Sequence, residues 1–195
     1  MLRQLKSAAP SLPQPAQASA LQLLANVERL YKRIDPLRDR RLTAMRSRVH
    51  GDFHLKQVLY TGKDFVIVDF AGDRARPPQD RRRKRSPLRD VACMLRSFDY
   101  AAGAVLLDAT QIRPEDREPA QRFAQLWVTW VQAAFLDGYL VRAGLAPFVP
   151  RDRSELAVLL DAFQIEKALE QLADDLGKGE PRSENPLRWL VSMVG

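Results

Sequence analysis

The sequence has little cysteine, little histidine and no long apolar segment, and each shortage excludes a class of protein. Its 195 residues include one cysteine, Cys93, which cannot form a disulfide within the chain and fits a reducing, cytoplasmic environment. No apolar run approaches the ~20 residues that span a bilayer. The N-terminal segment lacks the apolar stretch of a signal peptide, so we expect neither export nor a membrane partner.

The abundant residues indicate a folded, basic protein. Hydrophobic residues make up 46% of the chain, which is too many for a wholly disordered protein. The formal net charge of +7 could indicate an anionic partner such as a nucleotide, a nucleic acid or an acidic lipid. Part of the excess lies in the basic run 81–85, which has no interleaved aromatic residues for base stacking. We therefore expect no nucleic acid partner.

Apolar periodicity predicts a mainly helical domain over residues 20–195. Residues 1–19 are rich in Pro, Ala, Ser and Gln and predict a flexible arm. Helices are predicted at about 21–34, 37–45, 88–107, 120–142 and 153–176, with a short last helix from about Pro186. Asp152 and Glu155 have the spacing of a capping box at the start of the fifth. The aromatic residues of the fourth helix recur at helical spacing, which favours core packing over a sugar-stacking platform: Trp127, Trp130, Phe135 and Tyr139.

A small β-hairpin is predicted between the second and third helices. Two short β-rich runs, 58–60 and 65–68, are joined by a turn that contains Gly62. The second run is apolar throughout, so we expect it to be buried on both faces. The pairing would bring the polar residues before the first run close to Asp69, which follows the second.

Three residues around this hairpin have the layout of a phosphoryl-transfer site. Asp52 could accept the proton of a substrate hydroxyl, as an aspartate does in kinases. Gln57, five positions later, offers an amide oxygen, and Asp69 offers a carboxylate. Both are hard oxygen ligands of the kind that Mg²⁺ prefers.

The two histidines of the chain, His50 and His54, lie in the same loop and suggest a metal site as an alternative. They are too closely spaced with Asp52 on a non-helical segment to favour zinc, and no cysteine pair supports it. We expect His50 to lock the loop and His54 to bond backbone or contact phosphate. On spacing alone, an ordinary polar loop remains equally possible.

The segment His50-Gly-Asp-Phe-His54 resembles the His-Gly-Asp-x-His loop of the aminoglycoside phosphotransferase-like kinases, within the protein-kinase-like superfamily. With 69–72 and 81–102, it is similar to the bacterial maltokinases, which are often fused to trehalose synthase. The resemblance implies the C-terminal lobe of a kinase fold, with an N-terminal lobe or a trehalose synthase domain supplied upstream or by another chain. It also implies ATP as co-substrate, Mg²⁺, and transfer of the γ-phosphate to the anomeric hydroxyl of maltose. The product would be maltose 1-phosphate, for glycogen and trehalose metabolism.

The resemblance also implies roles for individual residues. Asp52 would be the catalytic base, and Gln57, where the family usually has Asn, would bind Mg²⁺ together with Asp69. Asp90 could equally anchor the catalytic loop, and Glu166 and Lys167 could equally form a solvated charge pair. The candidate substrate or scaffold residues are Arg89, Asp90, Asp99, Tyr100, Glu166 and Lys167.

Two further substitutions depart from the family. Lys56 stands where Gly is usual, and could either disturb a tight turn or contact phosphate. Ala71 stands where Glu is usual, so an acidic group is lost. No glycine-rich phosphate loop is present. These departures leave two alternatives to catalysis: a degenerate or truncated kinase-like remnant that binds a sugar or a partner, or an anion-binding module built on the arginine loop.

Overall fold

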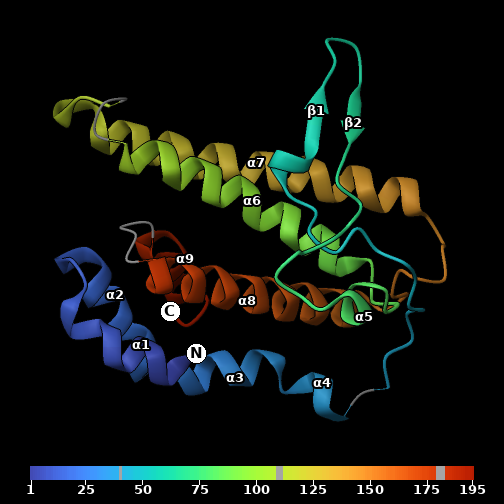
Figure 1. Cartoon of the computed structure of the whole chain (residues 1–195), viewed down its shortest axis with the longest axis horizontal. Helices are drawn as coiled ribbons and strands as arrows, with labels where there is room; N and C mark the ends of the chain where they lie inside the picture. Colours follow the sequence, from blue (N-terminus) through green and yellow to red (C-terminus); the bar gives the residue numbers. More distant parts are fainter. Residues whose placement is uncertain (40, 109–111, 179–182) are drawn as a thin grey trace.

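Three long helices form the frame of the computed structural model, which describes residues 1–39, 41–108, 112–178 and 183–195. They are α6 (Leu88–Leu107), α7 (Arg117–Ala143) and α8 (Arg153–Lys178). Helix α6 lies between the other two and packs on both (Figure 1). Leu88, Val91 and Leu95 of α6 are buried against Leu159 and Leu160 of α8. Burial of this apolar stripe is what orders the three helices together.

Helix α8 begins at a polar junction that differs from the predicted capping box. Asp152 accepts hydrogen bonds from the backbone N and the Oγ of Ser154, at 2.8 and 2.7 Å. Glu155 is 5% exposed and accepts from the backbone N and the Oγ1 of Thr43, both at 2.8 Å. The predicted helix 37–45 is therefore reduced to α4 (Pro36–Asp39), because Glu155 holds the following segment against α8.

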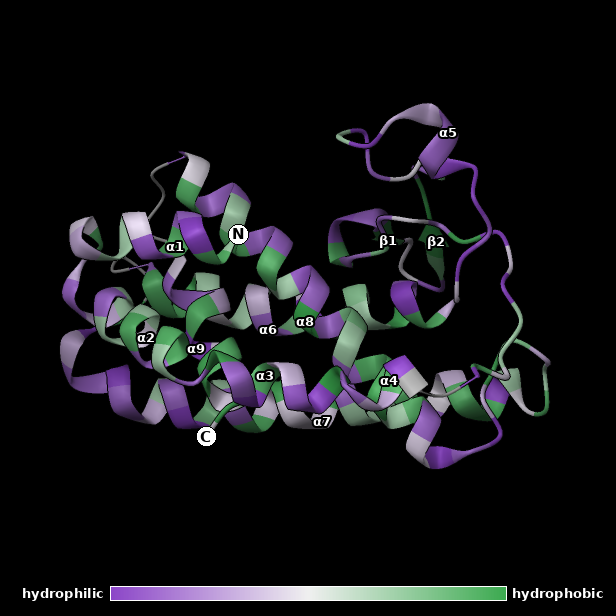
Figure 2. Ribbon diagram, turned by 90° about the horizontal axis from the view of Figure 1, so that it is seen from below, coloured by the Kyte–Doolittle hydropathy of each residue, from purple (hydrophilic) through white to green (hydrophobic). Residues whose placement is uncertain are grey.

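The N-terminal segment is folded, whereas the sequence predicted a flexible arm. Residues 1–19 contain α1 (Leu2–Ala8), a 3₁₀ turn (Ala9–Ser11) and the start of α2 (Gln14–Ala25). Leu5 and Ala20 are fully buried, and Ala9 and Ala16 are 2% exposed, in a core shared with α8 and with α9 (Glu184–Ser192). Alanines allow α2 to approach α9 closely, and Figure 2 shows these helices lying together. The composition concealed this role because Ala-rich, Pro-containing segments are also typical of linkers.

A break at Asn26 divides the predicted helix 21–34 into α2 and α3 (Val27–Ile34). Leu30 of α3 joins the same N-terminal core. The mainly helical fold with one hairpin is confirmed, and residues 20–34 differ from the prediction only in this interruption.

The predicted hairpin is present, but its predicted burial is wrong. Strands β1 (Val58–Tyr60) and β2 (Phe65–Ile67) pair antiparallel, with Val58 opposite Ile67. The hairpin projects away from the helices (Figure 1). Phe65 is 66% exposed and Val66 is 46% exposed, so neither face of β2 is covered. An apolar strand buries both faces only when other elements cover both.

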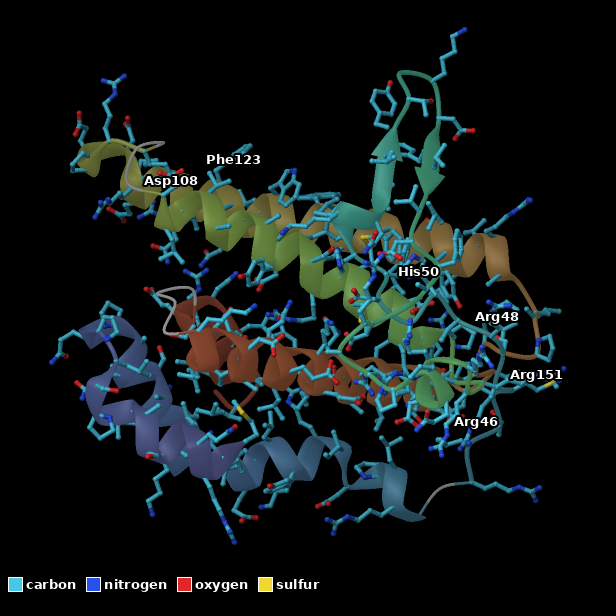
Figure 3. All side chains as sticks on the ribbon, viewed as in Figure 1. Arg46, Arg48, His50, Asp108, Phe123 and Arg151 are labelled. Atoms are coloured by element: carbon cyan, nitrogen blue, oxygen red, sulfur yellow. The ribbon has the colours of Figure 1, made fainter. Side chains whose placement is uncertain are left out.

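The aromatic residues of α7 also differ from the prediction. Trp130 is 73% exposed and Phe123 is 70% exposed; Figure 3 shows Phe123 on the outer side of the helix. Trp127 makes an edge contact with Phe98 of α6 and remains 40% exposed. Phe135 and Tyr139, in contrast, pack against the α6–α8 core as expected. No helix among the described residues is long and apolar enough to cross a membrane.

The packing of α1 gives a direct test of the correction. Leu5→Ala should lower the free energy of unfolding by about 2–5 kcal/mol, because it removes a fully buried side chain from the core. Leu21→Ala, in a neighbouring helix where Leu21 is 58% exposed, should change it by less than ~0.5 kcal/mol. Urea denaturation measures both. If both substitutions change the free energy of unfolding equally and negligibly, residues 1–19 form a flexible arm after all.

Candidate active site

Asp90, near the start of α6, holds the loop that carries the sequence motif. Its Oδ2 accepts a hydrogen bond from the backbone N of His50 at 2.6 Å, and its Oδ1 accepts one from the backbone N of Gly51 at 2.9 Å. Burial raises the pKa of the Asp90 carboxyl, although these two backbone donors oppose the rise. A two-bond anchor on a long helix fixes the position of the next residue, Asp52.

The imidazole ring of His50 connects this loop to the end of the hairpin. The side chain is 8% exposed and lies at the base of the hairpin (Figure 3). Its Nδ1 accepts a hydrogen bond from the backbone N of Asp52 at 3.4 Å, so Nε2 carries the proton and donates to the carbonyl of Val68 at 2.8 Å. The backbones of residues 52 and 68 are therefore only one imidazole ring apart.

The hairpin pairing continues past its strands to the backbone of Gln57, one of the two candidate metal ligands. The backbone N of Val68 donates to the carbonyl of Gln57 at 2.9 Å, so Gln57 lies opposite the residue before Asp69. Asp69 has a φ of 58°, a left-handed conformation that is uncommon for residues other than glycine and that clusters at functional positions. Its side chain is 33% exposed, with Arg74 Nη2 at 3.5 Å.

This donor set fits Mg²⁺ better than zinc. Among the described residues, no group of three or more His, Cys, Asp or Glu side chains could hold a metal ion, so the histidine alternative has no support here. Mg²⁺ usually takes one or two carboxylates and completes its shell with substrate phosphates and water. Gln57 and Asp69 would hold it, and the ion would supply charge to neutralise a transferring phosphate.

Asp52 lies in a polar, partly buried environment. Its Oδ2 is 3.4 Å from His54 Nε2, and its Oδ1 is 3.5 Å from Lys167 Nζ of α8. The pKa of the Asp52 carboxyl is below its usual value, chiefly because the His54 side chain hydrogen-bonds it and, against the opposing effect of burial, because Lys167 lies nearby. Asp52 is therefore ionised at neutral pH and able to accept a proton.

Helix α8 brings a row of charged groups to the side of Asp52. Lys167 is also 3.9 Å from Glu170, which pairs with Arg76 of the loop after Asp69. Arg89 Nη2 donates to Glu166 Oε1 at 3.0 Å, and the Arg89 guanidinium lies over the ring of Phe163. Sequence reasoning selected Glu166, Lys167 and Arg89 but missed two members. Arg76 and Glu170 carry no motif, and only the approach of the loop to α8 reveals them.

Two predicted residues lie elsewhere on α6. Asp99 pairs with the fully buried Arg96 at 2.8 Å, and the carbonyls of Asp99 and Tyr100 accept from Asn185 of α9. Nine residues separate Asp99 from Asp90, which is about 13 Å along a helix. Asp99 lines a cavity of about 240 Å³ between α6, α7 and α9. These contacts of Asp99 and Tyr100 are thus with Arg96 and with Asn185 of α9, and none of them is with Asp52.

Two of the residues that differ from the resembling kinases are at the surface. Lys56 and Ala71 are exposed, and the carbonyl of Ala71 accepts from Arg81 Nη1 at 2.8 Å. Arg85 forms two backbone hydrogen bonds with Ser47, at 2.9 Å each. Residues 81 and 85 of the basic run, the first in helix α5 (Pro78–Arg81), therefore tie the loops of the site to one another.

Comparisons with known proteins bear on the fold that carries this site. No protein-family model matches the chain. A curated relative, the glucosamine kinase of Streptacidiphilus jiangxiensis, is 33% identical over 91 residues, which are 47% of this chain and 19% of that protein. A solved glucosamine kinase (crystal form B) superposes with a TM-score of 0.73 and 22% identity, covering 100% of this chain and 44% of that one. A glucosamine kinase in complex with glucosamine, ADP and inorganic phosphate superposes with a TM-score of 0.73 and 20% identity. The match covers 100% of this chain and 43% of that one.

The chain has a kinase-like fold. The likeness extends over its whole length, which confirms the kinase-like fold predicted from the His-Gly-Asp-x-His loop. The chain spans less than half the length of the solved glucosamine kinases. Its alignment with the curated relative covers about a fifth of that protein. The relatives found are glucosamine kinases, and maltokinase is not among those described above.

The anchor at Asp90 can be tested by stability. Asp90→Ala should lower the free energy of unfolding by about 1–3 kcal/mol, because it leaves the part-buried backbone N of His50 without its acceptor. Asp137→Ala, at an exposed position of α7, is the matched control and should change it by less than ~0.5 kcal/mol. Chemical denaturation measures the difference. If both variants match the unaltered protein, Asp90 does not anchor the loop.

Proposed function

We propose that this chain is the acceptor- and metal-binding part of an ATP-dependent sugar kinase. The observation that carries the proposal is the His50 ring, which joins the backbone of Asp52 to that of Val68, immediately before Asp69. The ring thereby joins the two backbone segments that carry the proposed proton acceptor, Asp52, and the proposed metal-binding carboxylate, Asp69. This is the requirement of phosphoryl transfer, in which the protein mainly positions groups and neutralises charge.

In the proposed reaction, a sugar hydroxyl oxygen attacks the γ-phosphorus of ATP. The bond between that phosphorus and the β–γ bridging oxygen breaks, and ADP leaves with the electron pair. Asp52 accepts the hydroxyl proton. Because its carboxylate is partly buried, Asp52 is a better candidate than a solvent water molecule for accepting that proton. Mg²⁺ held by Gln57 and Asp69 would offset the negative charge of the phosphates. His54 and Lys56, on the same loop, are the proposed phosphate contacts.

Two sugars are candidate acceptors. Glucosamine is supported by the names of the relatives and by the complex that contains glucosamine and ADP. Maltose is supported by the resemblance to maltokinases, which phosphorylate its anomeric hydroxyl. We favour glucosamine, because both the sequence relative and the structural neighbours carry that name.

An ATP-binding part would complete the site, either in the same polypeptide or on another chain. The hairpin supports this proposal, since Phe65, Val66 and Ile67 are exposed and apolar next to Asp69. Apolar strands without a covering element are typical surfaces for another domain. The alternative is a binding module without catalysis. The exposed Ala71, where the resembling kinases carry an acidic residue, is the observation that favours it.

The catalytic role of Asp52 is tested by substitution in the protein that includes the ATP-binding part. Asp52→Asn should reduce ATP- and Mg²⁺-dependent sugar phosphorylation by roughly 10²- to 10⁴-fold, because the amide cannot accept the proton. Asp137→Asn makes the same charge change at an exposed site and should leave the rate unchanged. Coupled measurement of ADP release reads both. Turnover that persists in Asp52→Asn refutes the base assignment.

The acceptor is tested by binding and turnover together. Glucosamine at 100 times its Kd should stabilise the protein by about 2.7 kcal/mol, seen as a rise in melting temperature, and maltose should have a smaller effect. Under the preferred proposal glucosamine is also phosphorylated. A rise in melting temperature without any phosphorylation would favour the binding module. A larger rise with maltose than with glucosamine would reverse the choice of acceptor.

A further inference from the structure

Lys167 of α8 brings a cation to the carboxylate of Asp52, and neither group is widely open to solvent. The Nζ lies 3.5 Å from Asp52 Oδ1, and the two side chains are 20% and 25% exposed. The residues are 115 positions apart in the sequence, so the pair forms only when α8 packs beneath the loop. An ion pair that is partly shielded from water is stronger than one at the surface.

The carboxylate of Asp52 is held at both of its oxygens. Lys167 contacts Oδ1, while His54 Nε2 lies 3.4 Å from Oδ2. Two contacts on different oxygens restrict rotation of the carboxylate about its last bond. Each oxygen has two acceptor positions, so one remains on each for a substrate hydroxyl. Contact with Lys167 therefore orients Asp52 and leaves it able to accept a proton.

Lys167 is itself fixed, because Glu170 contacts it one turn further along the helix. Lys167 Nζ is 3.9 Å from Glu170 Oε2, and Glu170 pairs with Arg76. Arg76 Nε in turn donates to Asp73 Oδ2 at 3.3 Å. This row of charges runs from Asp52 across α8 to the loop that follows Asp69. Two carboxylates therefore lie beside the Lys167 ammonium.

We infer that Lys167 is a positioning residue that orients the Asp52 carboxylate and keeps it ionised, with Glu170 fixing the lysine. The inference rests on the proposed function, because Asp52 is the base only if the protein is a kinase. It gives Lys167 a role distinct from the substrate contact considered from the sequence. By this inference α8, through Lys167 and Glu170, contributes to the rate of phosphoryl transfer although it carries no recognised catalytic motif.

The charges around the pair are consistent with this role. Burial lowers the pKa of Lys167, but the sulfur of Cys93 and the carboxylates of Asp52, Glu170 and Asp73 raise it above its usual value. Burial raises the pKa of the Cys93 thiol to about 11, so Cys93 is neutral near pH 7 and the carboxylates account for the effect there. The groups that act on the Asp52 carboxyl are His54 and Lys167, and Asp52 in turn acts on the nearby Cys93.

Three variants test the inference in the protein that includes the ATP-binding part. Lys167→Met should lower kcat roughly 10- to 100-fold, a portion of the 10²–10⁴ that a positioned base contributes, with less than threefold change in the KM for the sugar. Lys167→Arg keeps the charge and should recover most of the rate. Lys178→Met removes an exposed lysine from the end of the same helix and should leave kcat unchanged. A rise in KM at constant kcat would instead make Lys167 a substrate ligand and overturn the inference.

A second measurement separates this inference from the proposed function. The titration of the Asp52 carboxyl, followed by carboxyl-carbon NMR, should move to higher pH in Lys167→Met and return toward its original position in Lys167→Arg. The acid limb of the kcat profile should move in the same direction. Movement of the NMR titration in a protein with no kinase activity supports the ion pair and refutes the proposed function. An unmoved titration overturns the positioning role, whether or not the protein is a kinase.

Discussion

The structure of the site depends on the carboxylate of Asp90, which accepts the backbone N–H groups of His50 and Gly51. A buried carboxylate is costly unless donors satisfy it, and here the donors belong to a loop that would otherwise have no fixed path. The bond attaches that loop to α6, whose apolar stripe is buried against α8. The loop is thus tied to the helix core by two hydrogen bonds. His50 then extends the order to the end of the hairpin through its ring.

The charged residues of the site come from three parts of the chain that pack around this anchor. The loop contributes Asp52, the segment after the hairpin contributes Arg76, and α8 contributes Lys167 and Glu170. Burial raises the pKa of the Glu170 carboxyl even though Arg76 and Lys167 act in the opposite direction, so these ion pairs only partly offset the loss of water. Partly buried charges at such a cost are more readily explained by function than by stability.

The exposed apolar surface has a pattern of its own. The helices bury their stripes in two clusters, whereas the hairpin and the outer face of α7 leave large side chains uncovered, among them Phe65 and Trp130. The hairpin lies beside the site, and the chain corresponds to less than half of the glucosamine kinases that it resembles. An ATP-binding part seated on the hairpin would cover that surface and place a nucleotide next to Asp69. The same contact would explain why a strand as exposed as β2 is apolar.

Local patterns in the sequence determined the long helices, the hairpin and the residues of the loop, because periodicity, turn residues and motif spacing act over a few positions. Gly144, with a φ of 53° at the end of α7, and the paired strands around Gly62 follow from such short-range signals. Tertiary structure alone decided what each surface faces. Leu5 and Ala16 are buried in a segment whose composition suggested a flexible arm. Strand β2 is exposed although it is apolar. Glu155 accepts a hydrogen bond from Thr43 rather than from the end of its own helix. Tertiary structure also brought Lys167 to Asp52, across 115 positions, since burial and ion pairing depend on partners that no local pattern specifies.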